Sequence, residues 1–254
     1  MSGPLHHLRN EARLMLYLQR RYWFESLLGF LFIIGLFCAL LFSVVSVSGK
    51  SVASGSLDTM IVGFVLWLFA TGSYNSAAND VAEESRHRTI EHIYVTPIGF
   101  ARILAHRAVL HLAVAALLLA VGIWIAGWLT AGRIHVDVLQ VLGTALLAAP
   151  ALAGVGYAVA GLLLLMKKVQ VMHALMYFVL ISLVALPAYP VNGLALLPYA
   201  LASAAVKASV TGAAIGPGVY LLIGLNSAVY LALGLLAFRL LERHARRLGV
   251  LGHC

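Results

Sequence analysis

Apolar residues in this chain gather into six long runs, separated by short stretches that hold nearly all of the charged residues. The runs lie near residues 24–47, 57–79, 104–131, 138–166, 171–189 and 218–241. An α-helix needs about 20 apolar residues to cross the hydrocarbon core of a bilayer, and each run is close to that length or longer. The pattern predicts an all-α, polytopic membrane protein with six transmembrane helices in a single domain over residues 1–254.

Two further segments carry their own pattern. Residues 5–22 place apolar side chains at helical spacing between arginines, which is typical of an amphipathic helix lying in the membrane interface. The alternative is a basic leader without fixed structure. The apolar positions of this pattern are Leu5, Leu8, Ala12 and Met15.

Residues 190–217 are largely apolar but are broken by Pro198 and several glycines. A fully solvated loop would not be this apolar, so we expect a re-entrant helical segment packed on protein. The alternative is a seventh transmembrane helix.

Composition and charge agree with a membrane protein. The chain is 62% hydrophobic and 10% charged, whereas soluble domains are roughly 45–50% apolar and about 25% charged. The net charge of +8 comes from lysines and arginines at alternate ends of the runs, which argues against a nucleic-acid partner. Fourteen of these residues fall on one side of a six-span topology and three on the other: Lys50, Arg133 and Lys207. Basic residues favour the cytoplasmic side, so both termini are predicted to be cytoplasmic, in the cell membrane.

Several short motifs suggest nucleotide binding, metal binding or ion coupling, but the surrounding sequence argues against each of them. The Ser-Gly-Lys-Ser stretch at 48–51 lacks the earlier glycine of a phosphate-binding loop, because Val44 stands there. No metal-binding motif is present, and Cys38 lies within a run far from Cys254, so neither a metal site nor a disulfide is expected. The runs hold almost no ionisable groups, which argues against an ion-coupled carrier. A secondary carrier nevertheless stays open, as does an intramembrane enzyme using His111 or His173.

The densest run of charge lies between the second and third apolar runs, at residues 80–97. Asp80 and Glu83 are expected to cap a helix, and Pro97 to end it. Ile90, Ile93 and Tyr94 would form one apolar face. On a predicted cytoplasmic side, such a segment is suited to dock a soluble partner; the alternative is an ordinary solvated loop.

The same segment carries a family resemblance. Glu83 or Glu84, followed by Thr89-Ile90-Glu91, Ile93 and Thr96-Pro97, resembles the motif that follows the second span in type-2 ABC exporter permeases, although Arg88 stands where that family usually has glycine. Residues 154–170 are similar to the family's glycine-rich fourth span, and residues 196–208 to its apolar segment before the last span.

The resemblance implies a permease subunit that pairs with a second copy or a paralogue and docks two ABC ATPase subunits, which bind the ATP and Mg²⁺. This chain would hold no cofactor and no catalytic residue. Amphipathic cargo would move along the dimer interface: a lipid-linked glycan, a lipid, a drug-like natural product or a peptide. The implied docking residues are Glu83, Glu84, Arg86, Arg88, Thr89, Ile90, Glu91, Ile93, Tyr94 and Pro97. The implied substrate path includes Phe64, Trp67, Thr71, Tyr74, Asn75, Tyr177 and Phe178.

Overall fold

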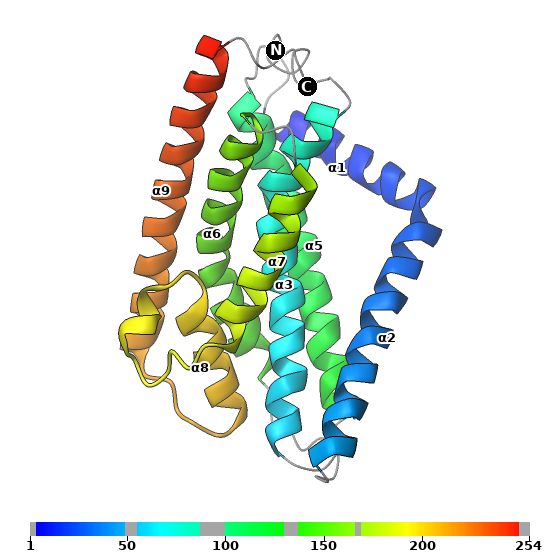
Figure 1. The fold of residues 1–254 in the computed structure, drawn as a ribbon, viewed down its shortest axis with the longest axis vertical. Helices are drawn as coiled ribbons and strands as arrows, with labels where there is room; N and C mark the ends of the chain where they lie inside the picture. The colour runs from blue at the N-terminus through cyan, green and yellow to red at the C-terminus, as the bar shows by residue number, and fades with distance from the viewer. Residues whose placement is uncertain (1–3, 49–54, 87–99, 130–136, 166–168, 249–254) are drawn as a thin grey trace.

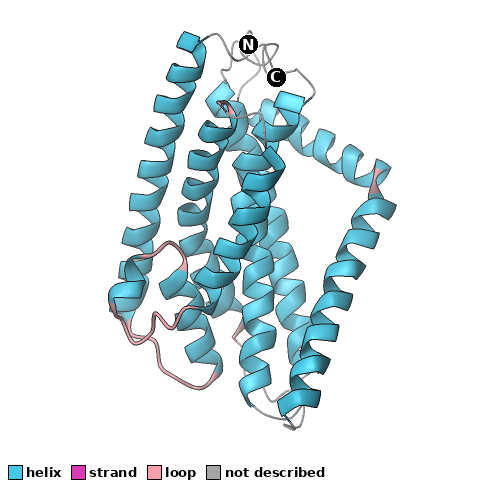
Figure 2. Ribbon diagram, in the orientation of Figure 1, coloured by secondary structure: helices cyan, strands magenta, loops and turns pink. Residues whose placement is uncertain are grey.

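The computed structural model describes residues 4–48, 55–86, 100–129, 137–165 and 169–248, and in these ranges the chain is helical with no strand. The prediction of an all-α protein is therefore confirmed for the described residues (Figures 1 and 2). The elements in chain order are α1 Pro4–Arg21, α2 Trp23–Ser48, α3 Gly55–Arg86, α5 Phe100–Leu129, α6 Val138–Leu163, α7 Val169–Ala185, the short 3₁₀ helix η1 Gly193–Leu196, α8 Ala200–Val210 and α9 Pro217–Leu248.

Each predicted apolar run overlaps one helix, namely α2, α3, α5, α6, α7 or α9, although the run at 171–189 is helical only as far as Ala185 and α7 has just 17 residues. Within the described residues, three segments are long and apolar enough to cross a membrane: Ile103–Trp128, Val138–Leu163 and Pro217–Leu248. A fourth is added if the bent pair Arg9–Arg21 and Trp23–Ala39 forms one span. These long apolar helices indicate a membrane protein.

A sharp bend separates the first two helices. The axes of Arg9–Arg21 and Trp23–Ala39 differ by 75°, so α1 runs across the end of the bundle from which α2 departs (Figure 1). Leu16, Tyr17 and Trp23 are exposed near this bend. Of the apolar positions predicted to face the membrane, Ala12 and Met15 are partly buried, and Met15 faces the protein between α1, α3 and α5, so the interfacial placement of α1 stays a prediction.

The centre of the bundle is α6, which packs closely against α9 and α3. Gly154 of α6 lies directly against the backbone of Gly234 on α9, where a Cβ on either residue would meet the other helix's backbone. Small residues permit this approach because they place no side chain between the helix axes. Around it, a core of Leu66, Phe69 and Leu152 is at most 2% exposed.

The segment between α7 and α9 is compact and largely buried. Every residue of α8 from Ala200 to Val206 is buried, and the helix contacts α3, α6, α7 and α9. The Tyr199 hydroxyl donates to the Leu66 carbonyl at 3.4 Å, and the Asn226 amide donates to the Leu196 carbonyl at 2.9 Å. An 11-residue helix is about 16 Å long, against about 30 Å of hydrocarbon core, so α8 by itself is too short to cross a membrane.

The ends of the helices sort into two groups in space. The end of α3, the beginning of α5 and the end of α9 lie at the same end of the molecule as α1, while α8 lies toward the opposite end (Figure 1). The arginines of α1 and of the last turns of α9 therefore share one end with Arg107 of α5.

Candidate functional site

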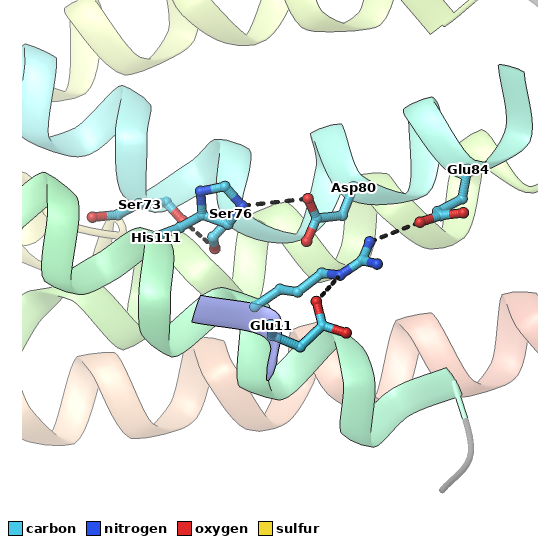
Figure 3. A network of polar contacts seen from close by, with 7 residues as sticks. Glu11, Ser73, Ser76, Asp80, Glu84 and His111 are labelled. Carbon is cyan, nitrogen blue, oxygen red and sulfur yellow. Dashed lines mark hydrogen bonds and ion pairs between the residues drawn. The ribbon is translucent and has the colours of Figure 1, made fainter. Parts of the chain in front are cut away.

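Five ionisable side chains converge where α1, α3 and α5 meet: Glu11, Asp80, Glu84, Arg107 and His111 (Figure 3). Arg107 of α5 donates from Nε to Glu11 Oε2 at 3.0 Å and from Nη1 to Glu84 Oε1 at 2.8 Å. One turn further along α5, His111 Nε2 lies 3.3 Å from Asp80 Oδ1. A single guanidinium thus links three helices that are far apart in sequence.

Helical spacing explains why these groups meet. Asp80 and Glu84 are four residues apart on α3, and Arg107 and His111 are four residues apart on α5. Residues at this spacing share one face of a helix. Because α5 runs back along α3, the two acidic groups face the two basic groups in reverse order, so that Glu84 meets Arg107 and Asp80 meets His111. The two doublets are visible in the sequence as pairs four residues apart, but Asp80 was expected to cap a helix and His111 was considered only as a residue of an intramembrane enzyme.

The cluster is only partly accessible to solvent. The side chains of Arg107, Glu84 and Asp80 are 21%, 16% and 13% exposed. Ion pairs at this degree of burial are screened less than surface pairs, and each member depends on its partner. The second oxygen of Asp80, Oδ2, is buried and has no hydrogen-bond partner among the described residues.

Next to the cluster is a pocket of about 720 Å³ between α1, α3 and α5. Its wall combines the charged groups with apolar side chains from α1 and α5. The lining residues are Glu11, Leu14, Met15, Leu18, Gln19, Tyr22, Glu25, Asp80, Glu84, Arg107, Leu110 and His111. Sequence reasoning did not find this pocket, because its walls come from segments almost 100 residues apart.

The predicted docking segment is described only at its beginning. The expected helix cap at Asp80 is wrong, because α3 continues without interruption to Arg86 and places Asp80 within the helix, facing α5. Glu83, Glu84 and Arg86 form the last turn of α3. The other predicted docking residues lie outside the described residues: Arg88, Thr89, Ile90, Glu91, Ile93, Tyr94 and Pro97.

The predicted path residues fall on α3 and α7, which contact each other. The Asn75 amide donates to the Tyr177 hydroxyl at 3.3 Å, which joins the two helices. Tyr74 is fully buried and meets the ring of His173 edge-on, with centroids 6.1 Å apart. Phe178 is 72% exposed and points away from this group.

Three of the predicted path residues have a buried polar atom without a partner among the described residues: Trp67 Nε1, Thr71 Oγ1 and Tyr74 Oη. Both ring nitrogens of the neighbouring His173, which was not a predicted path residue, are in the same state. Phe64 lies away from the α3–α7 contact, because its ring stacks on the ring of Phe37 on α2, with centroids 3.8 Å apart. Buried polar groups are normally satisfied, so this part of the α3–α7 contact is suited to water or a polar ligand.

Neither histidine is arranged as a catalytic base with a nucleophile in the described part of the chain. His111 faces Asp80, while the nearby Ser76 hydroxyl donates to the Ser73 carbonyl at 2.8 Å (Figure 3). His173 meets Tyr74 through its ring. No group of three His, Cys, Asp or Glu side chains within the described ranges converges as a set of metal ligands.

Comparison of the chain with protein-family models, curated proteins and solved structures finds no match. The geometry therefore defines a class: an all-helical membrane protein with a charged cluster and an amphipathic pocket at its arginine-rich end.

Proposed function

We propose that this chain is the permease subunit of an ATP-driven exporter of the type-2 ABC class, and that residues 80–97 dock the ATPase. The observation that supports the proposal most is the ion pair between Glu84 and Arg107. These two residues lie on either side of the 87–99 segment in the sequence, and their 2.8 Å contact joins the end of α3 to the beginning of α5. Arg107 also pairs with Glu11 of α1. A movement of the 87–99 segment on ATPase binding would therefore displace α1, α3 and α5 together.

The remaining features of the proposal follow from the helices. Six long helices would cross the cell membrane, both termini would be cytoplasmic, and α8 would form a re-entrant segment at the outer side. Two copies, or one copy and a paralogue, would pair along α2, α3 and α7, and an amphipathic cargo would move between them. ATP and Mg²⁺ would be bound by the two ATPase subunits.

Site-specific photocross-linking tests the docking surface. A photoreactive amino acid at Glu91 should capture an ATPase subunit in native membranes, whereas the same group at Thr211, near α8, should not. The double charge swap Arg88→Glu with Glu91→Arg should leave the chain folded but abolish transport-linked ATP hydrolysis. Normal transport by the swapped variant at normal expression would rule out docking at this segment.

An ion-coupled carrier is the second candidate, because the Asp80–His111 pair places two titratable groups beside the pocket. Such pairs are common in proton-coupled transporters. The two candidates differ in their energy source. Transport by the purified chain in vesicles, driven by a pH gradient without any ATPase, would favour the carrier.

A further inference from the structure

One side of α1 carries a row of arginines. Arg9, Arg13 and Arg20 are separated by four and seven residues, a spacing that places them along one side of a helix. All three side chains are exposed. None of them makes an ion pair within the part of the chain that the structure describes. The row therefore presents three positive charges on one side of α1.

The direction of this row follows from Glu11, which points the opposite way. Glu11 comes two residues after Arg9, about 200° around a helix that turns about 100° per residue. Its carboxylate contacts Arg107 of α5 at 3.0 Å. Because that contact turns Glu11 toward the bundle, the arginine row faces away from the bundle.

Apolar side chains are interleaved with the arginines. Leu16 and Tyr17 lie between Arg13 and Arg20 on the same side of the helix, and they are 70% and 64% exposed. Water offers nothing to an exposed leucine. A lipid surface offers phosphate groups to the arginines and the boundary of the acyl chains to Leu16 and Tyr17. This mixture of charge and apolar surface therefore fits a membrane better than it fits bulk water.

The bend after α1 keeps the row level with respect to the bundle. The axis of Arg9–Arg21 lies 75° from that of Trp23–Ala39, so α1 lies across the direction in which α2 runs (Figure 1). Trp23 and Phe24, at the bend, are both 59% exposed, and aromatic side chains favour the headgroup level of a bilayer. The row from Arg9 to Arg20 is roughly 16 Å long. Along such a level row, all three guanidinium groups can reach the headgroups of one leaflet together.

We propose that this outward face of α1, formed by Arg9, Arg13, Leu16, Tyr17 and Arg20, binds the phosphate groups of anionic phospholipids. Arginine suits this role because its planar guanidinium pairs with phosphate through two hydrogen bonds. The lipid is the occupant because it supplies both the negative charge and the apolar boundary that the face requires. The inference needs only a chain embedded in a membrane and does not depend on the export proposal.

Native mass spectrometry of the purified chain in neutral detergent tests the binding, with phosphatidylglycerol and phosphatidylcholine added at equal concentration. Phosphatidylglycerol should bind more tightly. A basic residue near an anionic lipid surface contributes a factor of about five to binding. The triple substitution Arg9→Gln, Arg13→Gln and Arg20→Gln should therefore weaken phosphatidylglycerol binding by at least about tenfold and leave phosphatidylcholine binding unchanged. The corresponding lysine triple keeps the charge and should retain most of the binding.

A second row of exposed arginines provides the matched control. Arg239, Arg243 and Arg247 are four residues apart on α9 and lie at the same end of the molecule as α1 (Figure 1). This row runs along the bundle rather than across it, so it rises by about 12 Å and leaves the headgroup level. Replacing all three by glutamine removes the same charge and should reduce phosphatidylglycerol binding much less.

Two results would overturn the proposal: equal binding of the two lipids, or equal losses in the two glutamine triples. The second would show that net charge alone attracts the lipid. Thermal unfolding in the same detergent verifies that each variant is folded. Should the α1 triple not fold, Arg13→Gln is compared with Arg243→Gln, and only the first should lose about fivefold in binding. The assay contains no ATPase, so failure of the export proposal and failure of lipid binding are separate results.

Discussion

Arg107 is the residue on which the charged cluster depends, because its guanidinium contacts carboxylates from two other helices, Glu11 of α1 and Glu84 of α3. Arg107→Gln would remove the guanidinium that pairs with Glu84 and Glu11. We expect a loss of about 1–3 kcal/mol of stability, the range for hydrogen bonds to charged groups that lose a partner. Loss of the link between α3 and α5 should also reduce coupling to any partner at residues 87–99. Thermal unfolding in detergent measures the first effect.

The matched control for this variant is Arg246→Gln. Arg246 pairs with Glu242 at 2.7 Å within α9, and its side chain is 55% exposed. Exposed pairs of this kind contribute roughly 0–1 kcal/mol, so little change in stability is expected. If both variants shift the unfolding temperature equally, Arg107 has no special structural role.

At the scale of the helices, the contact of α6 with α9 depends on glycine. Gly234→Ala would place a Cβ against the Gly154 carbonyl, with no flexible side chain to yield. Forcing an extra carbon into a close contact destabilises by about 1–3 kcal/mol. Gly143→Ala, also on α6, has open space around its Cβ and should be neutral or stabilising by roughly 0.4–1 kcal/mol. Opposite shifts in unfolding temperature for the two variants are the expected result, and a stable Gly234→Ala would show that the helices separate easily.

At the scale of the whole molecule, the structure gathers the arginine-rich ends of α1 and α9 at one end (Figure 1). The positive-inside rule then predicts that this end is cytoplasmic. In a variant lacking Cys38 and Cys254, a cysteine at the exposed Arg247 should label only from the cytoplasm, and one at the exposed Thr211 only from outside. The reverse pattern of labelling would invert the topology.

The amino-acid sequence by itself determined which segments are helical. The six apolar runs and the amphipathic stretch at 5–22 each overlap a helix, although the fifth run continues four residues beyond the end of α7 at Ala185. Length and hydrophobic spacing are local properties, so a single segment is enough to reveal them. The compact, apolar character of 190–217 was predictable for the same reason, since its composition is unsuited to a solvated loop. The contacts that this segment makes, such as the hydrogen bond from Tyr199 to the Leu66 carbonyl, could not be predicted from the sequence.

Only the tertiary structure decided how those helices form a site. Asp80 looked like a helix cap in the sequence, but packing of α3 on α5 keeps the helix intact and turns Asp80 toward His111. Glu11 and Arg107 are 96 residues apart, so neither local spacing nor composition brings them together. The pocket is likewise a product of tertiary structure, because its lining comes from α1, α3 and α5 together and no one segment forms it.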